Sequence, residues 1–180
     1  MSKINEILQE NIRITAQVIT EICQRNTRKQ VSDFPLTRNQ CYILKILHTS
    51  GEFLISELAR ILEISPAAAS KIIDRLEQME LVARQPHEGD RRSFEVKLLD
   101  KGRQLVEKIN QVTNKKLVPL MSQFSKEEKV QLLDFLQRIV KYTLADENNT
   151  DLICLQCGGK CGSSCAVETV EGICSRPKKK

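Results

Sequence analysis

The chain contains no tryptophan, and its seven other aromatic residues are two tyrosines and five phenylalanines. Any core must therefore be mainly aliphatic, and five prolines and seven glycines are few for an all-β protein of 180 residues. No uninterrupted apolar run approaches the roughly 18 residues that a membrane-spanning helix needs. The N-terminus mixes Lys3, Glu6 and Glu10 with apolar residues, unlike a secretory signal. We therefore expect a mainly helical, cytoplasmic protein with no membrane contact.

The sequence also lacks the motifs of common enzyme classes. It has no Walker A loop, no Gly-x-Gly-x-x-Gly, no Gly-x-Ser-x-Gly and no His-Glu-x-x-His. Its two histidines, His48 and His87, offer little material for hydrolytic catalysis. The net charge of +5 tolerates a polyanionic partner without requiring one. We predict that the protein is not an enzyme.

Apolar residues at three- and four-residue spacings predict long helices towards both ends of the chain. The first spans about 3–28. The second begins at Asp100, which we expect to act as its N-cap, and bends near Pro119. The third begins at a capping box formed by Ser125 and Glu128. These three helices enclose a middle segment with a different pattern.

Shorter helices are predicted in the middle of the chain. Thr37 and Gln40 form a capping box that starts a helix ending near residue 48. A short helix follows at 55–62. The next helix has Ser65 as its N-cap and Pro66 at its first position, and runs to about residue 79.

A β-hairpin is predicted directly after these helices. Apolar and polar residues alternate in 93–99, and 81–86 precedes it as a second strand. The polar, glycine-containing segment 87–92 forms the tip between the two strands. The hairpin as a whole spans about 81–99.

Two short helices joined by a tight turn and followed by a hairpin describe a winged helix-turn-helix. The second helix of this fold enters the major groove, whose width admits one helix, and the first helix braces it. The hairpin, or wing, reaches the adjacent minor groove, whose negative potential favours arginine. We predict a DNA-binding and dimerisation domain at 1–147 and a separate tail at 148–180, where the composition shifts.

The chain from about Ile4 to Leu144 resembles the MarR family of bacterial transcription regulators. The residues that carry the resemblance are Ile55-Ser56-Glu57-Leu58-Ala59, Ser65 to Leu76 ending in Asp74-Arg75-Leu76, and Asp90-Arg91-Arg92 followed by Val96-x-Leu98 and Lys101-Gly102-Arg103. The resemblance implies a homodimer with interlocked terminal helices, a palindromic operator, and repression relieved by a ligand or oxidant. The wide apolar faces of the terminal helices agree, because one small domain could not cover them. The chain departs from the family pattern at Glu80, where a glycine usually ends the recognition helix, and at Asp100, which replaces a threonine cap.

The second helix of the helix-turn-helix is the predicted recognition helix. The residues predicted to contact DNA from it are Ser65, Pro66, Ala67, Ala68, Ser70, Lys71 and Arg75. Ser65 and the first-turn amides suit a phosphate, and Ser70 and Lys71 are the best candidates for reading bases. Alanines can contact thymine methyl groups, which predicts an A·T-rich half-site. Alternatively, the alanines serve only helix formation and packing.

The hairpin supplies the other predicted contacts. Arg92 is expected in the minor groove or on a phosphate, with Asp90 fixing its rotamer through a charge-assisted hydrogen bond. Arg91 and Arg84 are expected to contact phosphates, Arg84 from the base of the hairpin. The alternative is that these are solvated surface charges.

Five of the seven cysteines gather near the C-terminus. They are Cys154, Cys157, Cys161, Cys165 and Cys174. In a reducing cytosol such a group indicates metal ligands or a redox switch rather than disulfides. The segment has almost no apolar residues and cannot fold by burial alone, whereas a bound metal could supply the missing free energy.

Three fates of this tail remain open. An iron–sulfur cluster is the first choice, because the first four cysteines resemble the compact ferredoxin-type run with a middle gap one residue longer. Structural zinc is the second, and a metal-free thiol switch or disordered tail the third. The leading hypothesis is a dimeric repressor whose operator affinity is coupled to a cluster or metal site. The alternatives are a DNA binder with purely structural zinc, and a redox or electron-transfer protein that uses the fold only to dimerise.

Overall fold

The structure is a computed structural model that describes residues 2–31, 36–87 and 90–145, with all side chains in these ranges except those of 22–31, 90–92, 116 and 145. The elements in chain order are α1 (Lys3–Val31), α2 (Arg38–Ser50), β1 (Phe53–Leu54), α3 (Ile55–Ile61), α4 (Pro66–Gln78), β2 (Val82–His87), β3 (Asp90–Leu98), α5 (Asp100–Met121) and α6 (Lys126–Ala145). Within these ranges, no helix combines the length and hydrophobicity that crossing a membrane requires.

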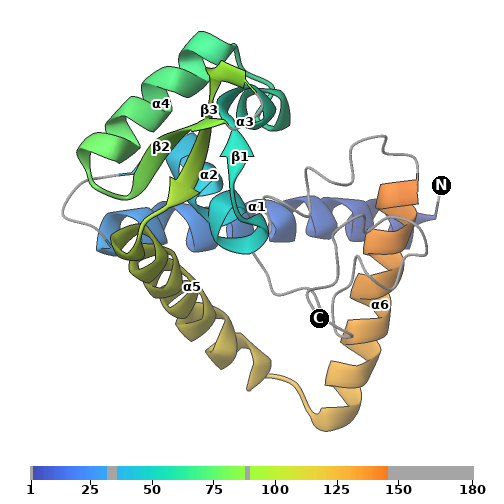
Figure 1. Cartoon of the computed structure of the whole chain (residues 1–180). Helices are drawn as coiled ribbons and strands as arrows, with labels where there is room; N and C mark the ends of the chain where they lie inside the picture. The colour runs from blue at the N-terminus through green and yellow to red at the C-terminus, as the bar shows by residue number, and fades with distance from the viewer. Residues whose placement is uncertain (1, 32–35, 88–89, 146–180) are drawn as a thin grey trace.

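The short helices and the sheet form one body beside the long helices (Figure 1). Helices α2, α3 and α4 and the three strands gather on one side of α1. Helix α5 packs against α1 and α2 and then leads away from this body, and α6 turns back at a sharp angle. The prediction of a mainly helical fold with a small antiparallel hairpin is thus confirmed.

The predicted helix starts rest on local hydrogen bonds that the structure confirms. The Thr37 hydroxyl accepts the Gln40 amide hydrogen at 3.3 Å, and the Gln40 side chain accepts that of Thr37 at 2.8 Å. Ser125 and Glu128 exchange the equivalent pair at 3.2 and 2.8 Å. The predicted cap at Asp100 is wrong, because Leu99 occupies the cap position and Asp100 is the first helical residue. A carboxylate in the first turn still favours the helix through its dipole.

The sheet has three strands in the order β1-β3-β2, all antiparallel, rather than the two predicted. Strand β1 is two residues long, too short for any alternation to reveal it, and pairs Phe53 with Val96. Strands β2 (82–87) and β3 (90–98) also reach further towards the hairpin tip than the predicted 81–86 and 93–99. Their pairing continues to His87 opposite Asp90, with a register irregularity between Pro86 and His87. The backbone of 90–92, assigned to the tip, therefore belongs to β3, and 88–89 lie outside the described residues.

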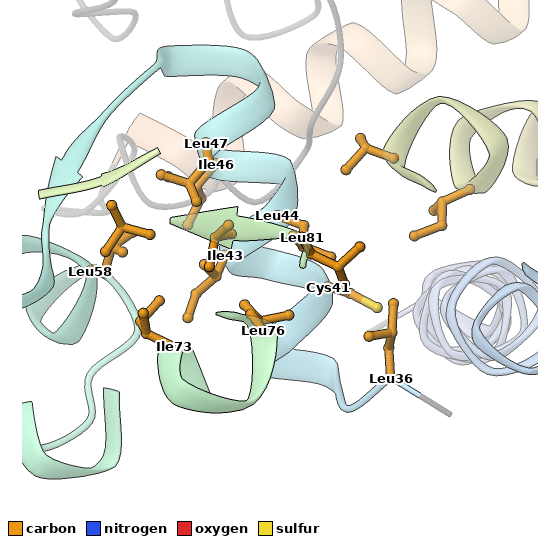
Figure 2. Close-up of a cluster of buried hydrophobic side chains, with 14 residues drawn as sticks. Leu36, Cys41, Ile43, Leu44, Ile46, Leu47, Leu58, Ile73, Leu76 and Leu81 are labelled. Carbon is orange, nitrogen blue, oxygen red and sulfur yellow. The ribbon is translucent and has the colours of Figure 1, made fainter. Parts of the chain in front are cut away.

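One aliphatic core ties the short helices to the sheet (Figure 2). Its fully buried large side chains are Ile43, Leu44 and Ile46 of α2, Leu58 of α3, Ile73 and Leu76 of α4, Val82 of β2, Val96 of β3 and Val106 of α5. Because α4 contributes to the same core as α2 and the hairpin, its opposite face is held in a fixed orientation.

The end of α4 explains how Glu80 replaces the expected glycine. Glu80 adopts a φ of 58°, in the left-handed region. The amides of Glu80 and Leu81 donate to the carbonyls of Glu77 and Leu76 at 2.9 and 3.0 Å, which closes the helix end. The Glu80 carboxylate also accepts a hydrogen bond from Lys101 Nζ at 2.9 Å, and this contact lowers the pKa of Glu80. The chain thus tolerates a strained residue where the family pattern has a relaxed one.

We expect the substitution Glu80→Gly to raise the melting temperature by a few degrees. Left-handed backbone costs a non-glycine residue about 1 kcal/mol, and the exposed contact with Lys101 adds little. Glu80→Ala is the matched control, since it loses the same contact and keeps the strain. Thermal unfolding at one protein concentration should rank glycine above glutamate and alanine. A glycine variant no more stable than the alanine variant would contradict this explanation.

In the described part of the chain, the long helices expose broad apolar faces. The exposed large apolar residues of α1 are Ile4, Ile7, Leu8, Ile12, Ile14, Val18 and Ile19, and those of α6 are Val130, Leu133, Phe135, Leu136, Ile139 and Tyr142. Ile12 and Leu136, near the middle of their helices, are each 50% exposed. Such faces normally pack against another surface.

Candidate nucleic-acid interface

The outer face of α4 carries most of the predicted DNA contacts. Ala69, Ile73 and Leu76 are fully buried and anchor the inner face. Pro66, Ala67, Lys71 and Arg75 are exposed, and Ala68 and Ser70 are half-buried. Because side chains four residues apart share a helix face, Ala67, Lys71 and Arg75 form one outward stripe with two cations.

Ser65 caps α4 as predicted. Its hydroxyl accepts the Ala68 amide hydrogen at 3.2 Å, and its carbonyl accepts that of Ala69 at 3.0 Å. Pro66 has no amide hydrogen. In the first turn, the Ala67 amide is therefore left to donate a hydrogen bond to a phosphate. The predicted phosphate site relied on several first-turn amides.

Arg84 occupies a different environment from the one predicted. Its guanidinium faces α4, where Nη2 forms an ion pair with Asp74 Oδ1 and donates to the Ser70 carbonyl and hydroxyl at 3.0 and 3.2 Å. Glu77 accepts the Arg84 amide hydrogen at 3.0 Å, and its other oxygen lies 3.9 Å from Arg84 Nε. The Arg84 side chain is 24% exposed. In the structure Arg84 joins the wing to the recognition helix, so the predicted phosphate contact would require it to leave these partners.

The contacts between Arg84 and α4 also constrain Ser70, which is predicted to read bases. Its hydroxyl oxygen accepts from Arg84, which orients the hydroxyl hydrogen away from the guanidinium. Sequence analysis did not predict the contacts of Arg84 with α4, although Ser70, Asp74 and Glu77 have the spacing of residues on one helix face. Their common partner lies on a separate element and could not be identified from that spacing alone.

We expect a double-mutant cycle of Arg84→Met and Asp74→Asn to give a coupling energy of about 1 kcal/mol in unfolding. The figure is modest because Asp74 is 47% exposed and solvent screens the pair. Arg84→Met should also weaken DNA binding by roughly tenfold, since α4 and the wing lose their fixed relative orientation. Arg103→Met, on the exposed surface of α5, is the control for loss of one cation. Zero coupling would show that the ion pair does not hold the wing.

The wing residues Asp90, Arg91 and Arg92 have a described backbone in β3, but their side chains lie outside the described part of the structure. Their predicted contacts with the minor groove and with phosphates stay predictions. The register places them beyond Phe94, which pairs with Pro86 and is 43% exposed. The hairpin therefore projects past the core before it reaches these residues.

A polar network that sequence analysis did not identify crosses the sheet. His87 Nδ1 lies 2.7 Å from Glu95 Oε1, and Gln85 Nε2 donates to Glu95 Oε2 at 3.3 Å. The same Gln85 nitrogen donates to Glu52, which directly precedes β1. The hydrogen bond from His87, and then that from Gln85, lowers the pKa of Glu95. The network joins the two strands of the hairpin to Glu52, which lies 33 residues before Gln85 in the sequence.

The predicted metal ligands Cys154, Cys157, Cys161, Cys165 and Cys174 all lie outside the described residues. Within the described residues, no cluster of three or more histidine, cysteine, aspartate or glutamate side chains could hold a metal ion. Cys41 belongs to α2 and its side chain is buried in the aliphatic core (Figure 2). In such surroundings a thiol acts as a small apolar side chain.

A known protein family matches the part of the chain that contains this site. The model of the MarR family matches residues 36–94. This range contains α2, α3 and α4, with β1 and β2, and ends inside β3. The match therefore includes the recognition helix and most of the wing.

Two relatives and one solved structure extend the similarity beyond that range. The chain is 30% identical over 131 residues to the HTH-type transcriptional regulator PecS of Dickeya dadantii, covering 71% of this chain and 79% of the relative. It is 26% identical over 140 residues to the HTH-type transcriptional repressor MdtR of Bacillus subtilis, covering 78% and 90%. The crystal structure of the Bacillus subtilis YusO protein superposes with a TM-score of 0.64 at 25% identity, covering 78% of this chain and 99% of that one.

Proposed function

The chain belongs to the MarR family of transcription regulators, which are not enzymes, and from this premise we propose that it is a homodimeric, cytoplasmic repressor of a palindromic operator. The observation that carries the proposal is the outward stripe of α4, defined by Ala67, Lys71 and Arg75, on a helix anchored by fully buried side chains. A rigid helix with exposed cations beside a projecting hairpin fits adjacent DNA grooves. The relative MdtR is itself named a repressor.

The apolar faces of α1 and α6 support the homodimer. Each helix exposes a row of large aliphatic side chains that water disfavours. A second copy of the chain presents the same two faces, so a two-fold arrangement can bury all four of them together. A dimer of recognition helices in turn requires an operator with two inverted half-sites.

The composition of the α4 stripe supports A·T-rich half-sites. Ala67 is exposed and offers a methyl group without hydrogen-bonding capacity, which suits the methyl group of thymine. Packing accounts for Ala69, which is fully buried, but not for Ala67.

Selection from a library of random duplexes tests this proposal. The full chain should recover inverted repeats rich in A·T pairs, and the affinity for the selected duplex should fall steeply with salt. Light scattering of the same preparation should give twice the chain mass. G·C-rich half-sites would contradict the role given to Ala67, and the absence of any enriched duplex would contradict operator binding.

For the tail we propose that Cys154, Cys157, Cys161 and Cys165 hold an iron–sulfur cluster whose state alters operator affinity, with zinc as the second choice and Cys174 as an extra or substitute ligand. The support is the spacing of the thiols and the scarcity of apolar residues around them. Regulation requires that the cluster-loaded and cluster-free forms differ in the spacing of the two DNA-binding heads, because a ligand indifferent to both shifts nothing.

Purification without oxygen tests the proposal for the tail. Visible absorption with matching iron and acid-labile sulfide would support a cluster, and loss of the cluster should change the affinity for the selected duplex. A colourless protein with one zinc per chain would contradict redox sensing and leave a structural zinc site. A cluster in a protein that selects no DNA would instead favour electron transfer.

A further inference from the structure

The side chains of His87 and Glu95 join the two strands of the wing near its tip. His87 is the last residue of β2, next to the register irregularity of the hairpin. Its Nδ1 lies 2.7 Å from Glu95 Oε1, so the ring donates its Nδ1 hydrogen to the carboxylate. The His87 side chain is 36% exposed and the Glu95 side chain 26%. The ring's second nitrogen can therefore exchange protons with solvent.

Charged residues of both signs lie near this pair. Glu52 joins the network through Gln85, and the side chains of Asp90, Arg91 and Arg92 lie outside the described part of the wing. Lys97 lies two residues beyond Glu95 on the same strand. In the described part of the chain, the ion pair recorded for Glu95 is the one with His87. The charge state of His87 therefore decides whether this pair carries a net charge.

Histidine is the side chain whose charge ordinarily changes between about pH 5 and pH 8. With a neutral ring, the pair carries the single negative charge of Glu95. With a protonated ring it carries no net charge, and the ring's second nitrogen becomes a hydrogen-bond donor. The hydrogen bonds from His87 and Gln85 lower the pKa of Glu95, so its carboxylate stays ionised over this range.

We propose that the His87–Glu95 pair makes DNA binding by the wing depend on protons, with tighter binding as the pH falls from about 8 to about 6. The inference rests on the proposed function, which brings the wing to the phosphate backbone. An uncompensated carboxylate repels phosphates, whereas the protonated pair does not, and its new donor can face a phosphate oxygen. By linkage, formation of the complex takes up protons.

The test is the affinity for the selected duplex at about pH 6, 7 and 8 and at constant ionic strength, with the full chain in every case. The wild-type protein should bind roughly three- to tenfold more tightly at the lowest pH than at the highest. His87→Gln should lose this dependence, because glutamine can still donate to Glu95 but cannot become charged. His48→Gln, which alters the chain's other histidine, is the matched control and should keep the full dependence.

A second variant separates charge from wing geometry. Glu95→Gln keeps an acceptor for His87 and removes the negative charge, so it should bind at about pH 8 nearly as tightly as the wild type does at about pH 6. The inference is overturned if the wild type binds DNA with the same affinity across the range, or if His87→Gln keeps the dependence. Failure to bind any duplex at any pH would instead overturn the proposed function.

Discussion

Substitution of Gly102 by alanine is expected to lower the free energy of unfolding by about 3 kcal/mol. A Cβ atom at this position would lie 2.2 Å from the Leu81 carbonyl oxygen and 2.7 Å from Leu98 Cδ1. The carbonyl belongs to the backbone between α4 and β2 and cannot move freely, because it accepts the Leu99 amide hydrogen at 3.0 Å. Relief of the clash must therefore separate α5 from the base of the wing or break that hydrogen bond.

The matched control for this substitution is Arg103→Ala, one residue further along α5 at an exposed position. It should change stability by no more than about 0.5 kcal/mol. Gly51→Ala provides a second comparison, since Gly51 has a φ of 93° but no atom within 4 Å of the added methyl group, so strain acts there without a clash. Denaturant unfolding at one protein concentration ranks the three variants. Equal stability of the Gly102 and Arg103 variants would show that the helix does not approach the wing this closely.

The elements that sequence analysis placed correctly are those whose signals are local. The capping boxes at Thr37 and Ser125 and the cap at Ser65 each depend on residues within one turn. Asp100 is the exception, because a cap residue and a first-turn acid differ by one position and no other signal in the sequence distinguishes them.

The features that sequence analysis missed depend on contacts between separate helices and strands. Strand β1 exists because Phe53 lies beside Val96 in the sheet, and two residues carry no period of their own. Arg84 was assigned to DNA because an arginine on a wing suggests that role, whereas Asp74 faces it from α4 in the folded chain. The pairing of His87 with Glu95 likewise requires the hairpin register, which the predicted strand ends did not define.

The exposed apolar faces of α1 and α6 could be predicted only in part from the sequence. Their presence on α1 and α6 follows from the helical spacing of aliphatic residues, and both faces are exposed among the described residues. The proposed homodimer would supply a surface of matching apolar character for both faces.

The outward stripe of α4 is proposed to lie in the DNA groove, and reversal of its two charges tests this placement most directly. The double variant Lys71→Glu, Arg75→Glu should bind the selected duplex at least about 100-fold more weakly than wild type, with a shallower salt dependence. Lys108→Glu with Lys115→Glu makes the same change in net charge at exposed positions of α5 and should lose only a few-fold. Equal loss of affinity in the two double variants, with both folded and equally dimeric, would contradict the account.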